Sequence, residues 1–208
     1  MKGLLLKDTL VASRQAKIYA VLGGFYLVYC YMIKDSTMLV TIGAMLSFFA
    51  LLNSFSYDEK CKWDNFALTM PISRKMIVLG KYLFGFLSCI VVSIVCAILA
   101  IVVLIALGNL ENLVETLGYS MLVSIALVVL LIDAMLPIIF KLGVEKARYF
   151  IMAIVMLPVI IILLLGNASI TLPVIDMKIL LIGGIVGTIL ITMLSYFLSL
   201  KFMKEKEF

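Results

Sequence analysis

Histidine is absent from this sequence, and its absence removes several kinds of chemistry at once. No Ser-His-Asp or Cys-His catalytic group, histidine zinc site or histidine-ligated haem can be built without it. The sequence also lacks a GxxxxGKS or GxxxxGKT phosphate-binding loop, so the chain cannot itself be a P-loop ATPase. We therefore expect neither an enzyme active site nor a cofactor bound by this chain.

Charged residues are also scarce: they make up 14% of the 208 residues, against 65% hydrophobic residues, and the mean hydropathy is +1.25. These values predict an all-α integral membrane protein, because apolar runs of roughly 20 residues can cross a hydrocarbon core as helices. We expect a single transmembrane domain, residues 1–208, whose six spans lie at about 16–33, 38–56, 79–107, 117–140, 149–166 and 178–200.

The basic residues are sorted by side of the predicted membrane. Fifteen of the 17 lysines and arginines lie in the amino segment, in the loops after spans two and four, and in the carboxyl tail. The loops on the opposite side hold only Lys34 and Lys178. By the positive-inside rule, both termini and the long loop at residues 57–78 are cytoplasmic. This sorting explains the net charge of +5 without a nucleic-acid partner.

The amino-terminal residues 3–15 form an imperfect amphipathic pattern. It sets Leu4, Leu6 and Leu10 against polar residues that include Lys7 and Asp8. The pattern predicts a helix lying along the cytoplasmic interface before span one. An ordinary basic flank without a fixed helix is the alternative.

The loop at residues 57–78 gathers an unusual share of charge together with the only tryptophan. A helix over Asp58–Phe66 would place Trp63 and Phe66 on one apolar face, which Met70 continues, and Pro71 would end it. Such a helix has two possible partners. It can lie on lipid headgroups with Trp63 as anchor, or dock its apolar side into a groove on a soluble subunit.

A second helix is expected directly after this loop. Ser73 can cap its first N–H groups, and a helix from Arg74 to Leu107 would be about 51 Å long. Its first turns would then project from the membrane.

Polar side chains within the spans are few, and they are the candidates for lining a translocation path. The principal ones are Ser47, Asn53 and Asp133. Asp133 is the only acidic residue inside a predicted span, and a group at that depth is costly. It can contact a basic cargo, pair with a hydroxyl of a neighbouring span, or reach a water-filled vestibule.

Three stretches carry a family resemblance: "LLLKD" at residues 4–8, "YDEKCKWDNFALTMPISRKMIVLGKYL" at residues 57–83 and "LPIIFKLGVEKARYF" at residues 136–150. With them the chain resembles, over essentially its whole length, the permease subunit of ABC-2 type ABC transporters. In size it is similar to the small bacterial permeases that export antimicrobial or amphipathic peptides, such as the phenol-soluble modulin exporters.

The resemblance implies a permease of the bacterial cytoplasmic membrane that pairs with a second, identical or homologous permease and with two ABC ATP-binding subunits. ATP and Mg would bind in those subunits. The loop would contain the coupling helix, and the residues that dock on the ATPase would be Glu59, Lys62, Trp63, Phe66, Met70 and Arg74. The expected cargo is an amphipathic or antimicrobial peptide. The alternatives are a lipid, drug or other hydrophobic cargo, or a non-transporting scaffold or immunity protein.

Overall fold

The computed structural model describes residues 2–35, 37–69, 72–107, 113–165 and 177–205, and these residues form eight helices and no strand. The helices are α1 (Lys2–Arg14), α2 (Ala16–Ile33), α3 (Thr37–Lys60), α4 (Trp63–Thr69), α5 (Arg74–Leu107), α6 (Leu113–Leu142), α7 (Val144–Leu165) and α8 (Met177–Glu205). The predicted all-α class is confirmed.

Five of the described helical stretches are long and apolar enough to cross a membrane, namely Ala16–Ile33, Thr37–Lys60, Arg74–Ala106, Leu117–Leu142 and Gly183–Glu205. The remaining predicted span, 149–166, falls on α7, where several side chains lie outside the described set. The count of six spans therefore stays a prediction. The chain divides into two units, Met1–Ile132 and Asp133–Phe208.

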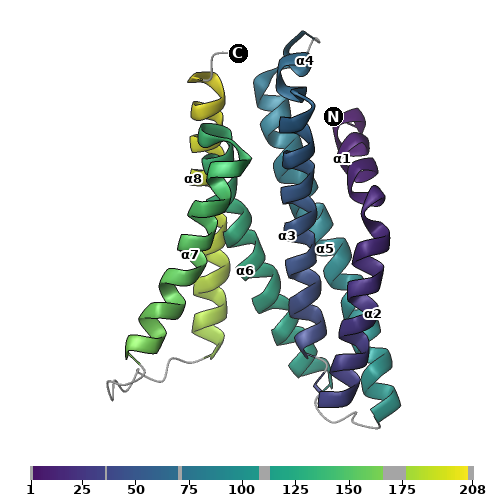
Figure 1. The fold of residues 1–208 in the computed structure, drawn as a ribbon. Coiled ribbons are helices and arrows are strands. Elements are labelled where there is room, and N and C mark those ends of the chain that lie inside the picture. Colours follow the sequence, from purple (N-terminus) through teal and green to yellow (C-terminus); the bar gives the residue numbers. More distant parts are fainter. Residues whose placement is uncertain (1, 36, 70–71, 108–112, 166–176, 206–208) are drawn as a thin grey trace. The chain divides into compact units, whose positions relative to one another are not determined.

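Helix α3 forms the centre of the first unit. Small residues recur on its buried side, including Gly43, Ser47 and Ser54, and they let α5 approach closely. A Cβ added at Gly43 would overlap the side chain of Cys96 on α5. Helices α1 and α2 follow one another along α3 and α5, with a bend at Gln15 between them (Figure 1).

The amino-terminal helix is present, so the alternative of an unstructured flank is wrong. Its orientation differs from the amphipathic pattern, however. Leu4 and Asp8 are buried against the first unit, whereas Leu6 and Leu10 are 62% and 57% exposed. The sequence pattern placed Asp8 on the polar side, and the structure turns it inward because α3 and α5 supply partners for its carboxylate.

The loop after α3 differs from the single helix expected over Asp58–Phe66. Helix α3 continues without a break to Lys60, past the predicted end of the span, because its last turn packs Asp58 against α1 and α5. Lys62 then adopts a left-handed conformation with φ of 49°, which ends α3 and starts α4 in a new direction. Met70 and Pro71 lie outside the described residues.

Helix α5 begins where the sequence predicts. The Ser73 hydroxyl accepts a hydrogen bond from the Met76 N–H at 3.3 Å, which is an N-cap. The helix runs for 34 residues, from Arg74 to Leu107, so its length of about 51 Å exceeds the hydrocarbon core. Both boundaries agree with the sequence analysis.

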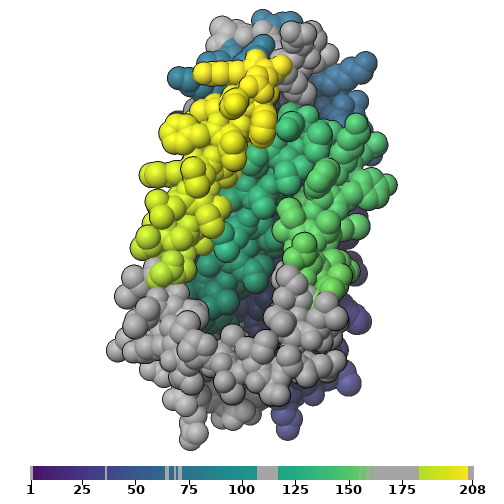
Figure 2. Space-filling view, turned by 90° about the vertical axis from the view of Figure 1, so that its left-hand side faces the viewer, coloured from purple at the N-terminus to yellow at the C-terminus, as the bar shows by residue number. Residues whose placement is uncertain are grey.

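The second unit consists of the end of α6, α7 and α8. Gly143, with φ of 82°, makes the tight turn from α6 to α7, a conformation that favours glycine. On α8 the buried side chains Ser195, Ser199 and Met203 recur every four residues and form one inward stripe. Figure 2 shows α7 and α8 at the surface.

The close contact of α3 with α5 can be tested at Gly43. Gly43→Ala should destabilise the protein by about 1–3 kcal/mol, because the new methyl group overlaps Cys96 in a packed core. The measurement is the midpoint of thermal unfolding in detergent. Cys96→Ala, which removes the thiol, should restore part of the loss.

Gly24→Ala is the matched control, since nothing lies within 4 Å of a Cβ added there. It should be neutral or stabilise α2 by up to about 1 kcal/mol through helix propensity. Equal stability of the Gly43 and Gly24 variants would contradict the close packing of the two helices.

Candidate functional site

Four charged side chains from three helices meet at the end of the first unit that carries α4. We call Lys7, Asp8, Asp58 and Lys81 the ion cluster. The Lys7 Nζ lies 2.5 Å from Oδ1 of Asp58 and 3.3 Å from Oδ1 of Asp8. The Lys81 Nζ lies 2.9 Å from Oδ1 of Asp8 and 2.6 Å from Oδ2 of Asp58. Each cation therefore contacts both anions.

The ion cluster is buried and electrically balanced. The Asp8 and Lys81 side chains are 3% and 6% exposed, while that of Lys7, the most accessible of the four, is 21% exposed. The Ser54 hydroxyl joins the cluster: it donates a hydrogen bond to Asp8 at 2.8 Å and accepts one from Lys81 at 2.7 Å. Removing charges from water is expensive, and this many charge-assisted hydrogen bonds are what offsets the cost.

Aromatic rings extend the ion cluster to α4. The Lys7 Nζ lies 4.4 Å from the centroid of the Trp63 ring, and the Lys81 Nζ lies 4.7 Å from that of Phe55. Both distances suit cation–π attraction, which is stronger when the cation is desolvated. Trp63, the first residue of α4, is thereby held against α1. A movement of α4 would act on the ion cluster through this contact.

Phe66 is the more exposed aromatic residue of α4. Its ring lies 5.6 Å from that of Trp63, centroid to centroid, yet Phe66 is 54% exposed. The pair predicted from the sequence is therefore brought together, with Trp63 turned toward the protein and Phe66 available to a partner. Aromatic residues of this kind are typical anchors of protein interfaces.

The other predicted docking residues differ in exposure. Glu59 and Lys62 are exposed, Arg74 is half-buried, and Met70 lies outside the described residues. A second link between α1 and α3 lies nearby, where the Arg14 guanidinium donates to the Tyr57 hydroxyl at 3.0 Å. Whether these residues contact an ATPase stays a prediction.

The sequence analysis did not identify the ion cluster. The sequence pattern places Lys7 and Asp8 on the polar side of the amino-terminal helix and gives no partner to Asp58 or Lys81. One signal was available: Ser54 and Asp58 are four residues apart and so share a face of α3, as Leu4 and Asp8 do on α1. A carboxylate on the same face as a buried leucine needs a partner.

Two of the predicted path residues make internal contacts in the first unit. Ser47 is fully buried, and its hydroxyl donates to the Ala44 carbonyl of its own helix at 2.5 Å. Asn53 donates from Nδ2 to Gln15 Oε1 at 2.6 Å and to the Tyr19 hydroxyl at 3.0 Å. Asn53 thus fastens the bend between α1 and α2 to α3. Their role in a translocation path stays a prediction.

Asp133, the third path candidate, is buried in the second unit at 1% exposure. Its Oδ2 accepts a hydrogen bond from the Thr192 hydroxyl of α8 at 2.5 Å, and its backbone carbonyl accepts one from Ser195 at 2.5 Å. Its Oδ1 has no hydrogen-bond partner among the described residues. Pairing with a neighbouring hydroxyl, one of the possibilities open from the sequence, is thus present but satisfies only one oxygen.

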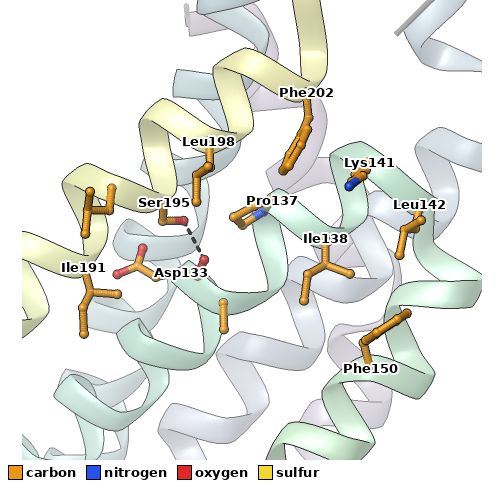
Figure 3. A pocket seen from close by; sticks show the side chains of 12 residues that line it. Asp133, Pro137, Ile138, Lys141, Leu142, Phe150, Ile191, Ser195, Leu198 and Phe202 are labelled. Atoms are coloured by element: carbon orange, nitrogen blue, oxygen red, sulfur yellow. Dashed lines mark hydrogen bonds between the residues drawn. The ribbon is translucent and has the colours of Figure 1, made fainter. Parts of the chain in front are cut away.

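Asp133 also lines an open groove of about 430 Å³ on the second unit (Figure 3). We call it the Asp133 groove. One face of α6 supplies Asp133, Pro137 and Lys141, α7 supplies Phe150, and α8 supplies Leu198 among other apolar residues. No group of three or more His, Cys, Asp or Glu residues able to hold a metal ion occurs in the part of the chain that the structure describes.

Comparison with known proteins identifies the family. A family model described as ABC-2 family transporter protein matches residues 3–204, and the chain therefore belongs to this family. Neither the curated proteins nor the solved structures include a match. The resemblance to ABC-2 permeases is confirmed, whereas the narrower likeness to phenol-soluble modulin exporters finds no support here.

Family membership gives the chain a role in a larger assembly. It is a multi-pass membrane protein, the permease subunit of an ABC transporter. Its partner is a separate ABC ATP-binding subunit, which hydrolyses the ATP. The ion cluster and α4 lie in two of the stretches that carry the resemblance, 4–8 and 57–83. The third stretch, 136–150, supplies part of the lining of the Asp133 groove, including Pro137 and Phe150.

The ion cluster can be tested by removing one of its cations. Lys81→Met leaves Asp8 and Asp58 buried opposite a single lysine, and breaking a buried ion pair in this way costs about 3–5 kcal/mol. The thermal unfolding midpoint in detergent should fall accordingly. Lys75→Met, an exposed lysine on the same helix, should stay within about 0.5 kcal/mol of the parent.

A double mutant separates charge balance from packing. Adding Asp8→Asn to Lys81→Met restores neutrality, so the pair should be more stable than Lys81→Met alone. Losses that simply add would show that the two side chains do not interact.

Proposed function

We propose that the chain is the permease of an ATP-driven exporter and that α4 is its coupling helix. The observation that supports this is the division of roles within α4, where Trp63 is held by Lys7 and Phe66 projects outward. A helix that is attached through one aromatic residue and exposes another can transmit a partner's movement. An anchor that only rested on lipid would have no need of the contact to the ion cluster.

The coupling proceeds through the ion cluster. When two ATP-binding subunits close on ATP and Mg, they draw α4 with them, and Trp63 passes the displacement to Lys7. The cluster joins α1, α3 and α5, so these three helices move together. ATP shifts the equilibrium between inward-open and outward-open states because its subunit contacts α4 differently in each. The assembly contains two such permeases, identical or homologous.

The proposed cargo is an amphipathic peptide moved out of the cell. Polar groups in the spans are few, and those of Ser47 and Asn53 are already engaged within the protein. A densely polar cargo such as a sugar would therefore find few hydrogen-bond partners. The Asp133 groove, which is lined largely by apolar side chains, suits a ligand with an apolar face.

Coupling can be tested at Phe66, which is half exposed and whose ring contacts that of Trp63. Phe66→Ala should leave the thermal unfolding midpoint close to that of the parent, yet weaken association with the ATP-binding subunit by about tenfold or more, as loss of an interface anchor does. Co-purification and transport-coupled ATP hydrolysis are the measurements. Trp63→Ala should reduce both coupling and stability, since it also faces Lys7.

Tyr31→Ala is the control, an aromatic side chain 54% exposed at the far end of α2. It should change neither association nor ATP hydrolysis. If the Phe66 variant assembles and transports like the parent, α4 is a membrane-surface anchor and the coupling proposal fails.

The orientation in the bacterial cytoplasmic membrane can be tested with the native cysteines. Cys61 is exposed in the turn before α4, whereas Cys30 and Cys89 are buried. A membrane-impermeant thiol reagent should label Cys61 rapidly in inverted vesicles and not in intact cells, with Cys61→Ser as the control. Labelling of Cys61 in intact cells would place α4 outside and overturn the orientation.

A further inference from the structure

The Asp133 carboxylate has one oxygen satisfied and one left over. Thr192 donates a hydrogen bond to Oδ2, and Ser195 donates one to the backbone carbonyl of the same residue. Oδ1 is buried and has no hydrogen-bond partner among the described residues. An oxygen of this kind in a medium of low dielectric constant is costly, and the cost disappears when a donor reaches it.

The groove that Asp133 borders determines which donor fits. The Asp133 groove has a volume of about 430 Å³, within the range of small-ligand sites, and Pro137, Ile138 and Leu198 line it with apolar surface (Figure 3). A ligand that reaches the carboxylate therefore brings an apolar part that packs along the groove. A small hydrated cation would leave this surface unused.

Charge fixes the direction of the ligand. Asp133, Pro137 and Lys141 lie four residues apart on one face of α6, so the acid and the base are separated by eight residues, or about 12 Å. Lys141 is held over the ring of Phe202, with its Nζ 5.0 Å from the centroid. A cationic group is repelled at the Lys141 end and attracted at the Asp133 end.

We infer that the Asp133 groove binds an amphipath that carries an ammonium group. The ammonium donates to Oδ1 of Asp133, and the apolar part lies along α6 and α8 toward Lys141. The inference gives the chemical class of the proposed cargo. That the ligand is transported rests on the proposed function, whereas its binding does not. The binding step itself requires neither ATP nor the ATP-binding subunit.

Bilayer lipid is the competing occupant, and the spacing of charges argues against it. The ammonium and phosphate groups of phosphatidylethanolamine are joined by only two carbons, so an ammonium at Asp133 would bring the phosphate close to the same carboxylate and leave it far from Lys141, about 12 Å away along α6. Its acyl chains offer no donor to Oδ1. A single-chain cation, or a lysine side chain of an amphipathic peptide, carries its charge at one end of an apolar stem. It therefore offers both a donor to Oδ1 and an apolar part to pack along the groove.

The test uses two matched photoreactive probes on the purified permease without its ATPase, in phosphatidylcholine nanodiscs. One is dodecylamine with a diazirine near the far end of the chain, and the other is the same molecule with a hydroxyl in place of the amine. Mass spectrometry maps the adducts. The ammonium probe should label residues of the Asp133 groove, such as Leu198 and Phe202, about tenfold more than the alcohol, and excess dodecylamine should compete.

Variants assign the effect to the carboxylate. Asp133→Asn keeps the size of the side chain and an oxygen for Thr192, and labelling by the ammonium probe should fall to the level of the alcohol. Ser120→Ala, which removes a hydroxyl of α6 that lies outside the Asp133 groove and donates to its own helix, should label like the parent. Unfolding midpoints identify any variant that fails to fold.

The outcomes are separable from those of the coupling experiment. Equal labelling by the two probes in the unmodified protein would show that the Asp133 groove is ordinary lipid-facing surface and would overturn the inference, whatever the variants do. Unchanged labelling in a folded Asp133→Asn variant would overturn it too. Neither result bears on α4, and failure of the Phe66 test leaves the binding measurement intact.

Discussion

The first unit depends on two lysines and two aspartates that are withdrawn from water together. None of the four charges could be buried alone, since an isolated ion in a medium of low dielectric constant is strongly destabilising. In the ion cluster each cation meets two anions, and Ser54 supplies further hydrogen bonds. The arrangement is possible only when α1, α3 and α5 stand in one relative position, so it fixes how these helices are placed.

This requirement explains the features that otherwise look irregular. Helix α3 continues past its apolar stretch because Asp58 has to reach the ion cluster, and α1 turns Asp8 inward while leaving Leu6 and Leu10 exposed. The chain can start α4 only by leaving the direction of α3, and the left-handed Lys62 makes that change. Trp63 then contacts Lys7 directly. A segment joined to the same charges that position three helices is joined to all of them.

Most of the helices could be predicted from local sequence patterns. The length of an apolar run and the Ser73 cap both depend only on residues that are close together in the sequence. The long helix starting at Arg74 is an example. The inward turn of Asp8 could not be predicted in this way, because its partners Ser54 and Lys81 lie 46 and 73 residues away. The break at Lys62 was missed for a related reason: the end of α3 is set by contacts of Asp58, not by the residues around position 62.

A buried carboxylate is costly unless it is paired, and the carboxylates of the two units differ in how completely they are paired. In the first unit, Oδ1 of Asp58 and Oδ1 of Asp8 accept hydrogen bonds from lysines, and Oδ2 of Asp58, which has no hydrogen-bond partner among the described residues, is paired with the Lys81 ammonium. In the second unit, Thr192 compensates one oxygen of Asp133, and the other is buried without a hydrogen-bond partner among the described residues, in a residue that borders the Asp133 groove. Stability alone would favour an apolar residue at that position. A buried acid that is positioned but incompletely paired is better explained by a ligand that completes it, and an ABC-2 permease has a cargo to supply that ligand.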